Sequence, residues 1–182
     1  RENLLFTNIR NNKEAFKLRE LGRVSPKSVV QSKQLGDSPI ILDPQSLVPL
    51  VPEDFTGDTC LVVGGILGDH PPRGRTSLAL TKKLPHMSSR NLGLYQFSVD
   101  GAVYVALNIA SGKLIADIPV KLGAELSLSK KHVTFLPFAY PLVRGKPLMA
   151  PGLRQYLRRE IFEDEEVLFR TGRSPSVAHV KS

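Results

Sequence analysis

The chain has 182 residues, of which 41% are hydrophobic, and a formal net charge of +8. This length supports one domain with a proper core and argues against a second full domain, and the single cysteine, Cys60, excludes an internal disulfide. No membrane-spanning run or signal peptide is visible, so we expect a cytoplasmic protein with no membrane partner. The positive charge favours an acidic partner such as RNA, with ordinary solubilising charge as the alternative.

The first quarter of the chain predicts alternating short elements. It reads in order as a strand, a helix, a polar connection and a second strand, at residues 3–7, 12–21, 25–38 and 40–42. Asp43 and Pro44 follow the second strand and form a turn signal. We interpret Asp43 as the cap of that turn. The alternative is that Asp43 lies near a bound cofactor and positions the residues that contact it.

A glycine-rich stretch, LVVGGILGDHPPRGRT at residues 61–76, is the strongest candidate for a functional site. Residues 61–63 predict a buried strand of a parallel sheet. The glycines that follow would let a ligand lie against bare peptide groups at the carboxyl end of this strand, where open α/β sheets bind ligands. The spacing matches neither a phosphate-binding loop nor the dinucleotide fingerprint, and a plain tight turn capped by Asp69 is the alternative.

A second candidate stretch, RNLGLYQFSVDGA at residues 90–102, follows a helix predicted at residues 76–84. It places Gln96, Ser98 and Asp100 between apolar residues and leads into another helix. That helix runs to about residue 110 and has almost no polar side chain, so we expect it to be buried nearly all round, with Asp100 as its N-cap.

The remaining chain predicts extended segments followed by a basic helix. The extended segments lie at residues 118–122, 126–129 and 133–140, and the helix lies at residues 152–162. Residues 163–182 form an acidic and then basic tail, mobile from residue 171 onward. The histidines do not cluster with each other or with the cysteine, so we expect no metal site.

The two candidate stretches together resemble a known family. GGILGDHPPR at residues 64–73, followed by the pattern RxLGxxQxxxDxA, is similar to the SPOUT superfamily of S-adenosylmethionine-dependent methyltransferases. The match is to the archaeal and eukaryotic branch of predicted RNA methyltransferases, which includes a fungal arginine methyltransferase of a small-subunit ribosomal protein. Residues 2–9, 42–54 and 136–151 share the resemblance.

The resemblance implies an α/β fold, in which a parallel sheet is flanked by helices and carries a C-terminal trefoil knot. It implies one domain over residues 1–162, and because members of the family ordinarily carry another strand and helix before the strand at residues 3–7, we expect that first strand and helix to be missing. S-adenosylmethionine is the implied cofactor. Its implied contacts are Gly64, Gly65, Ile66, Leu67, Gly68, His70, Pro71, Leu92, Gly93, Gln96, Phe97, Ser98, Val99 and Asp100.

Methyl transfer from a sulfonium needs no metal, so the residues must align a nucleophile and manage its proton. Asp69 is our first candidate for that role, and Arg73 is the candidate anchor for a carboxylate. The family relationship favours an arginine of a ribosomal protein as the substrate. A ribosomal or transfer RNA substrate is the second hypothesis, and a non-catalytic RNA-binding or ribosome-binding module is the third. A monomer and a homodimer both stay open.

Overall fold

The computed structural model describes residues 3–32, 35–36, 38–64, 74–129, 132–159 and 161–172. The chain divides into two compact units, Arg1–Gln34 with Gln155–Ser182, and Leu35–Arg154. Its strands are β1 (Leu5–Phe6), β2 (Arg23–Val24), β3 (Ser38–Leu42), β4 (Thr59–Val63), β5 (Ser88–Arg90), β6 (Val120–Ser129), β7 (His132–Val143) and β8 (Lys146–Pro147). Its α-helices are α1 (Asn12–Leu18), α2 (Arg75–Ala79), α3 (Val99–Ala110), α4 (Leu153–Arg159) and α5 (Ile161–Thr171). Short 3-10 helices are η1 (Val29–Gln31), η2 (Pro52–Asp54), η3 (Thr81–Lys83) and η4 (Ile115–Asp117).

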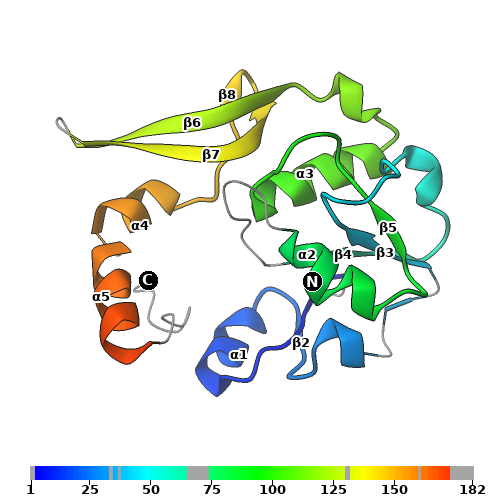
Figure 1. Cartoon of the computed structure of the whole chain (residues 1–182), viewed down its shortest axis with the longest axis horizontal. Helices are drawn as coiled ribbons and strands as arrows, with labels where there is room; N and C mark the ends of the chain where they lie inside the picture. The colour runs from blue at the N-terminus through cyan, green and yellow to red at the C-terminus, as the bar shows by residue number, and fades with distance from the viewer. Residues whose placement is uncertain are drawn as a thin grey trace. The chain divides into compact units, whose positions relative to one another are not determined.

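A three-stranded parallel sheet forms the centre of the larger unit (Figure 1). Its strand order is β4-β3-β5, and Ile41 of β3 pairs with Val62 of β4 and Ser89 of β5. The two predicted strands at residues 40–42 and 61–63 are therefore parallel neighbours in this sheet. Parallel order places the carboxyl ends of all three strands at one edge of the sheet, which sets the position of the candidate site.

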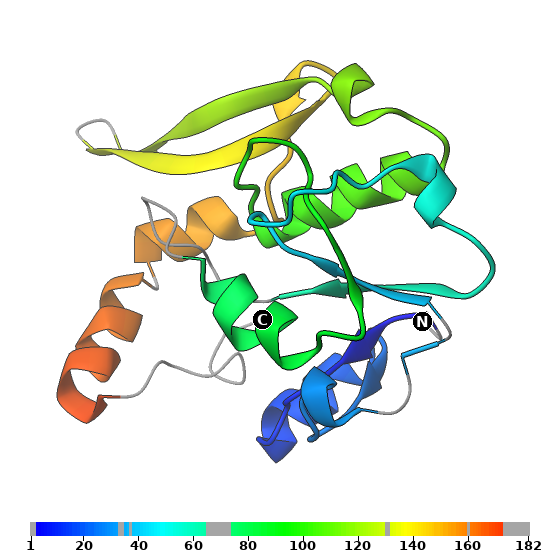
Figure 2. The same ribbon diagram turned by 45° about the vertical axis from the view of Figure 1, so that its right-hand side comes forward.

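The core of this unit lies between the sheet and α3, which crosses one face of the strands (Figure 2). Ile40 and Leu42 from β3 pack with Val105 and Ile109 from α3, and all four side chains are buried. Because side chains alternate along a strand, Ile41 points to the opposite face, and it is completely buried as well. Burial on both faces explains the continuous apolar run of this strand.

The prediction that the helix at residues 100–110 is buried nearly all round is wrong. Only one face of α3 is covered, and Val99, Val103 and Leu107, spaced four residues apart, are exposed, Leu107 to 60%. The predicted N-cap is wrong as well. The helix begins one residue earlier, and the Gly101 N–H donates to the Ser98 side chain over 3.4 Å. Apolar composition alone therefore overestimated the packing around this helix.

The extended segments after α3 form one long antiparallel ribbon (Figure 1). The two shorter stretches expected at residues 118–122 and 126–129 join into β6, which pairs with β7 along its length. The register shifts between Leu122 and Ala124 because Gly123 has a φ of 67° and inserts an irregularity.

Two helices follow the ribbon where one was predicted. The basic helix ends at Arg159, and α5 begins at Ile161 and contains the acidic run at residues 163–166. Residues 173–182, expected to be a mobile tail, lie outside the described part of the chain. Among the described residues, no helix combines the length and apolarity needed to cross a membrane.

Candidate functional site

Three strand ends converge at the carboxyl edge of the central sheet. Asp43 follows β3, Gly64 follows β4 and Asn91 follows β5. Since β3 is the middle strand, Gly64 and Asn91 lie on either side of Asp43, about 10 Å apart at the usual strand spacing. The structure therefore brings the first residues of both candidate stretches to one edge of the sheet, although they are far apart in the sequence.

Asp43 is a buried acidic residue at the start of the turn that follows β3. The Gln45 N–H donates to Asp43 Oδ1 over 2.9 Å, so the predicted turn cap is confirmed. The Thr81 hydroxyl donates to Asp43 Oδ2 over 2.6 Å. Thr81 begins η3, directly after α2, so this contact ties the segment beyond the glycine-rich stretch to the middle strand.

Ser46 and Asn91 join the same turn to the end of β5. The Ser46 hydroxyl donates to the Ser89 carbonyl over 2.9 Å, and Asn91 Nδ2 donates to the Ser46 carbonyl over 2.8 Å. Asn91 Oδ1 in turn accepts the Gly93 N–H over 2.8 Å. One side chain therefore fixes both the preceding turn and the start of the second candidate stretch.

Gly93 sits in a conformation that requires glycine. Its φ is +82°, and a Cβ at this position would lie 3.2 Å from Ile115 Cδ1. Leu92 before it is buried against the core, whereas Leu94 after it is fully exposed. The chain thus turns outward at Gly93 and presents main-chain groups beside an apolar residue at the edge of the sheet.

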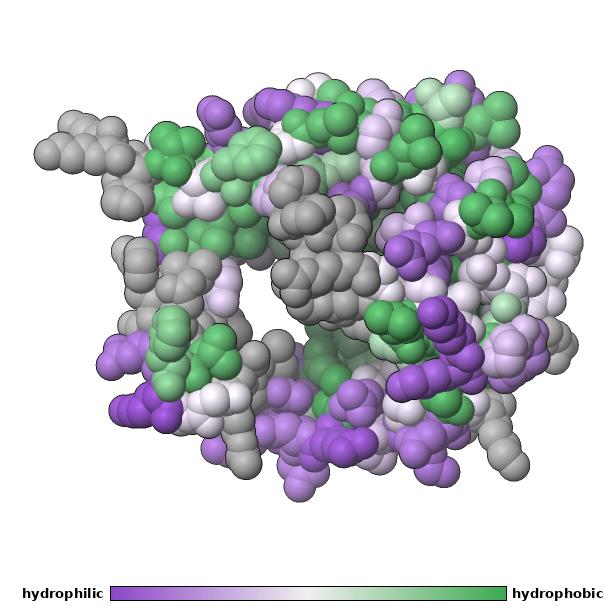
Figure 3. Space-filling model, in the orientation of Figure 1, coloured by the Kyte–Doolittle hydropathy of each residue, from purple (hydrophilic) through white to green (hydrophobic). Residues whose placement is uncertain are grey.

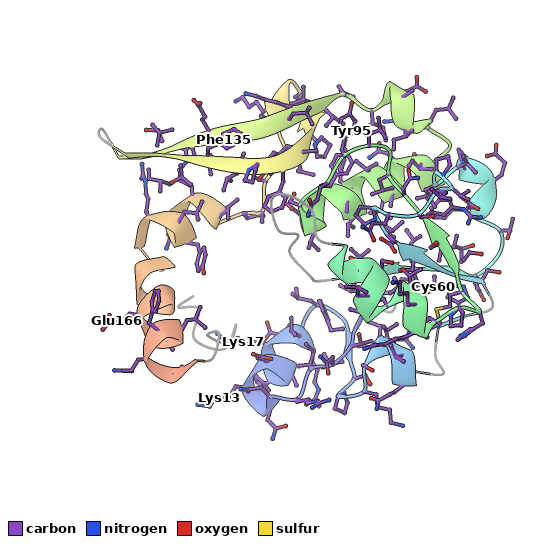
Figure 4. All side chains as sticks on the ribbon, viewed as in Figure 1. Lys13, Lys17, Cys60, Tyr95, Phe135 and Glu166 are labelled. Atoms are coloured by element: carbon purple, nitrogen blue, oxygen red, sulfur yellow. The ribbon has the colours of Figure 1, made fainter. Side chains whose placement is uncertain are left out.

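The rest of the second stretch is held against the ribbon. The Ala139 N–H donates to the Gln96 carbonyl over 2.8 Å, and Phe97 forms a parallel bridge with Ala139. Tyr95, which is labelled in Figure 4, packs edge-on against Phe97, and their ring centroids are 6.0 Å apart. These contacts fix the backbone of residues 92–98 from both ends, which is a requirement for a preorganised binding loop.

Tyr140 lies beneath the start of α3 and is only 2% exposed. Burial, together with the negative charge of Asp100, raises the pKa of its phenol, so Tyr140 is neutral at physiological pH. Its position on β7 is next to Ala139, which contacts Phe97. The charge of Asp100, in the first turn of α3, therefore acts on the phenol of Tyr140 in β7.

An ion pair anchors the end of β5. Arg90 Nη2 lies 2.7 Å from Asp54 Oδ1, and Arg90 Nε donates to both carboxylate oxygens at 3.0 and 2.9 Å. The Val51 N–H also donates to Asp54 Oδ2 over 3.1 Å. The hydrogen bonds from the Arg90 guanidinium lower the pKa of Asp54, and those to Asp54 raise the pKa of Arg90. A polar pocket of about 330 Å³ beside this pair includes His86 and Glu53 and reaches the amino end of β3.

Several predicted site residues fall outside the described part of the chain. These are Gly65, Ile66, Leu67, Gly68, Asp69, His70, Pro71 and Arg73. On either side of them, Gly64 follows β4, and Gly74 has a φ of 63° and lies against the Gln45 side chain. In the described residues, no group of His, Cys, Asp and Glu side chains has the arrangement of a metal site.

Sequence reasoning missed the groups that connect the strand ends. Ser46, Thr81 and Asn91 each bridge segments that are 38 to 45 residues apart. The Asp54–Arg90 pair was missed for the same reason. The only local signals were the Asp-Pro-Gln-Ser segment after β3 and an asparagine two residues before a glycine, and neither is specific.

Comparison with known proteins identifies the family. Residues 1–164 match the family described as "Protein arginine N-methyltransferase SFM1-like". The chain belongs to this family. The protein arginine N-methyltransferase SFM1 of Saccharomyces cerevisiae is 35% identical over 122 residues, which are 66% of this chain and 57% of the yeast protein. The chain thus spans little more than half the length of this SFM1-like relative.

Solved structures of SFM1-like proteins share the fold. The yeast arginine methyltransferase SFM1 complexed with SAH has a TM-score of 0.73 and 30% identity, covering 85% of this chain and 80% of that one. The same enzyme complexed with SAM has a TM-score of 0.74 and 29% identity, covering 86% of this chain and 77% of that one. The mixed α/β fold with a parallel sheet and flanking helices is therefore the fold of these yeast structures.

Proposed function

We propose that the chain transfers a methyl group from S-adenosylmethionine to the guanidinium group of a protein arginine. Membership in the SFM1-like family over residues 1–164 carries this proposal. The yeast structures with SAM and SAH support the choice of cofactor. The site fits such a group, because the turn at Gly93, with its positive φ, offers main-chain groups where parallel strands end.

S-adenosylmethionine supplies a methyl group already activated on a sulfonium. The chain therefore has to bind the cofactor, orient the nucleophile and accept its proton. Main-chain groups of residues 92–99 hold the adenine and methionine ends in this proposal. The buried Leu92 side chain supplies an apolar contact, and Gly64 allows a close approach at the end of β4, on the other side of β3. The Asn91 side chain orients this loop through its hydrogen bond from the Gly93 N–H.

The substrate side of the site is assigned to two charged residues. Asp69 binds the substrate guanidinium through paired hydrogen bonds and favours the loss of its proton during transfer. Arg73 binds a carboxylate of the cofactor or of the substrate, because its planar fork matches that geometry. The family motif GGILGDHPPR, which contains both residues, is the support for these roles. Gln96 and Asp100 are the second choices.

The finer features of the family resemblance are also part of this proposal. They are SPOUT membership, a trefoil knot around the cofactor, a substrate arginine in a ribosomal protein, a cytoplasmic location, and a monomer or homodimer. The formal net charge of +8 supports a substrate protein that is associated with RNA. The knot would place residues 64–73 and 90–102 around one cofactor.

Radiolabelled S-adenosylmethionine and ribosomes that lack the modification test the proposal. We expect protease to release the label as methylarginine. Label released by ribonuclease would instead establish an RNA methyltransferase, and cofactor binding without any label would refute the ribosomal substrate. Failure to bind the cofactor at all would favour the non-catalytic module.

Two variants test the site directly. Gly93→Ala should weaken cofactor binding at least tenfold, because a Cβ there meets Ile115 and strains the turn. Gly57→Ala is the matched control, since Gly57 also has positive φ but has open space around it. Asp69→Asn should retain cofactor binding and lose turnover. Wild-type turnover of this variant would remove Asp69 from the mechanism.

A further inference from the structure

Positive charge is concentrated near the start of the chain. Residues 3–32 contain six basic and two acidic side chains, which gives +4 of the formal net charge of +8 in 30 of 182 residues. All six basic side chains are exposed: Arg10, Lys13, Lys17, Arg19, Arg23 and Lys27. Half of the net charge therefore lies on the surface of about a sixth of the chain.

The β1–α1–β2 segment folds so that basic residues distant in the sequence become neighbours. The two strands are parallel, with Leu5 opposite Arg23. Beyond them the Asn8 N–H donates to the Lys27 carbonyl over 2.8 Å. This bond brings Lys27 beside the connection that carries Arg10 and leads into α1.

The outer face of α1 continues this positive surface. Ala15 is buried on the inner face of the helix, and Lys13, Phe16 and Lys17 lie within about 100° of arc on the other side. Figure 4 shows Lys13 and Lys17 projecting from the same side of α1. Figure 3 shows hydrophilic side chains gathered over the region where α1 lies in Figure 1.

Phe16 distinguishes this surface from an ordinary solvated face. Its side chain is 70% exposed although it is among the largest apolar groups of the segment. It lies at one edge of that arc, about 60° around the helix from Lys13 and about 100° from Lys17. An exposed ring beside cations has the composition of surfaces that bind single-stranded nucleic acid, where cations contact phosphates and rings stack on bases.

We propose that Arg10, Lys13, Phe16, Lys17 and Lys27 form a basic face that binds RNA. The cations contact phosphates independently of sequence, and Phe16 stacks on an unpaired base. An acidic peptide would pair with the lysines but has no base to stack on Phe16. This inference stands apart from methyl transfer, because it concerns residues of the unit that contains α1, whereas the strand ends of the proposed site belong to the other unit.

Fluorescence anisotropy with a labelled 20-nucleotide oligouridine tests the proposal on the whole chain. Lys13→Gln with Lys17→Gln should weaken binding about tenfold and lower the steepness of log K against log salt by about 1.4, for two lost phosphate contacts on a single strand. Phe16→Ala should weaken binding about tenfold and leave that slope unchanged. Circular dichroism and cofactor binding should be the same in all variants.

The matched control removes the same charge elsewhere. Lys82 and Lys83 are exposed neighbours in η3, and Lys82→Gln with Lys83→Gln should leave the affinity within twofold. An equal loss of affinity in both double variants would show that binding depends only on the overall charge, and it would overturn the proposal. So would a wild-type Kd weaker than about 100 μM at 50 mM salt. Tighter binding to polyglutamate or to phosphatidylserine vesicles than to oligouridine would also overturn it.

Discussion

Asp54→Ala removes the carboxylate that anchors the last residue of β5. Arg90 then loses the hydrogen bonds of its guanidinium to Asp54, and the Val51 N–H loses its acceptor. Arg90 immediately precedes Asn91 and the loop at residues 92–98, so the loss acts on the proposed cofactor site as well as on stability. We therefore expect two measurable effects from this one change.

The size of the stability effect follows from burial. Exposed ion pairs contribute about 0 to 1 kcal/mol, whereas deleting one partner of a buried pair costs about 3 to 5 kcal/mol. The side chains of Asp54 and Arg90 are 11% and 21% exposed, so this pair lies between those limits. We expect a loss of about 2 to 3 kcal/mol, which for a chain of this size lowers Tm by roughly 5 to 10 °C.

The pH dependence supplies an independent check. The pKa of Asp54 is lowered in the folded state from 3.8, so its contribution is complete above about pH 4 and is lost as pH falls through the lower folded value. Wild-type stability should therefore fall in acid more steeply than that of Asp54→Asn. Chemical denaturation between pH 2 and 7 measures this difference.

The control and the refuting results are specific. Asp58→Ala removes an exposed acid from the same connection and should cost under about 0.5 kcal/mol. In a double-mutant cycle with Arg90→Ala, a coupling energy near zero would refute the reasoning. Normal cofactor affinity in Asp54→Ala, measured by titration calorimetry, would show that the pair does not position the loop.

Three further predictions concern buried groups. Thr81→Val leaves Asp43 Oδ2 without its 2.6 Å donor and should cost about 2 kcal/mol in urea denaturation, whereas a cost below 0.5 kcal/mol for this variant would contradict the structure. Tyr140→Phe should abolish the loss of stability expected above pH 10, because the raised pKa of the buried phenol makes folding weaker as pH rises; an unchanged alkaline slope would rule Tyr140 out as its source. Ile109→Ala, in the centre of the core, should lower unfolding free energy by about 2 to 5 kcal/mol, and a smaller loss would mean that the core relaxes around it.

Local patterns were sufficient for the elements that build the sheet. The aliphatic run of β3 predicted a buried strand, and the Asp43–Pro44 pair predicted the turn that follows it. The motifs at residues 64–73 and 90–102 were sufficient for the family. Each of these features depends on residues within twelve positions of one another, so it is visible without tertiary information.

Local patterns failed where the burial or the boundary of a segment depends on its packing against a distant segment. The composition of α3 predicted burial all round, but packing covers only the face that meets β3, and Leu107 stays exposed. Ser98 replaced Asp100 as the helix cap because residues 96–97 are held against β7, which fixes where the backbone can enter the helix. Neither result is contained in helix periodicity.

The sequence by itself determined β3 and β4, the turn at Asp43, the family and the excess of positive charge, since each follows from residue type and short-range spacing. Only the tertiary structure decided which groups meet. Parallel pairing of β4, β3 and β5 places Gly64, Asp43 and Asn91 at one edge, and hydrogen bonds across 38 to 45 residues lock that edge together. The physical reason is that such contacts form only after loop closure has brought distant segments side by side, and no local preference encodes that closure.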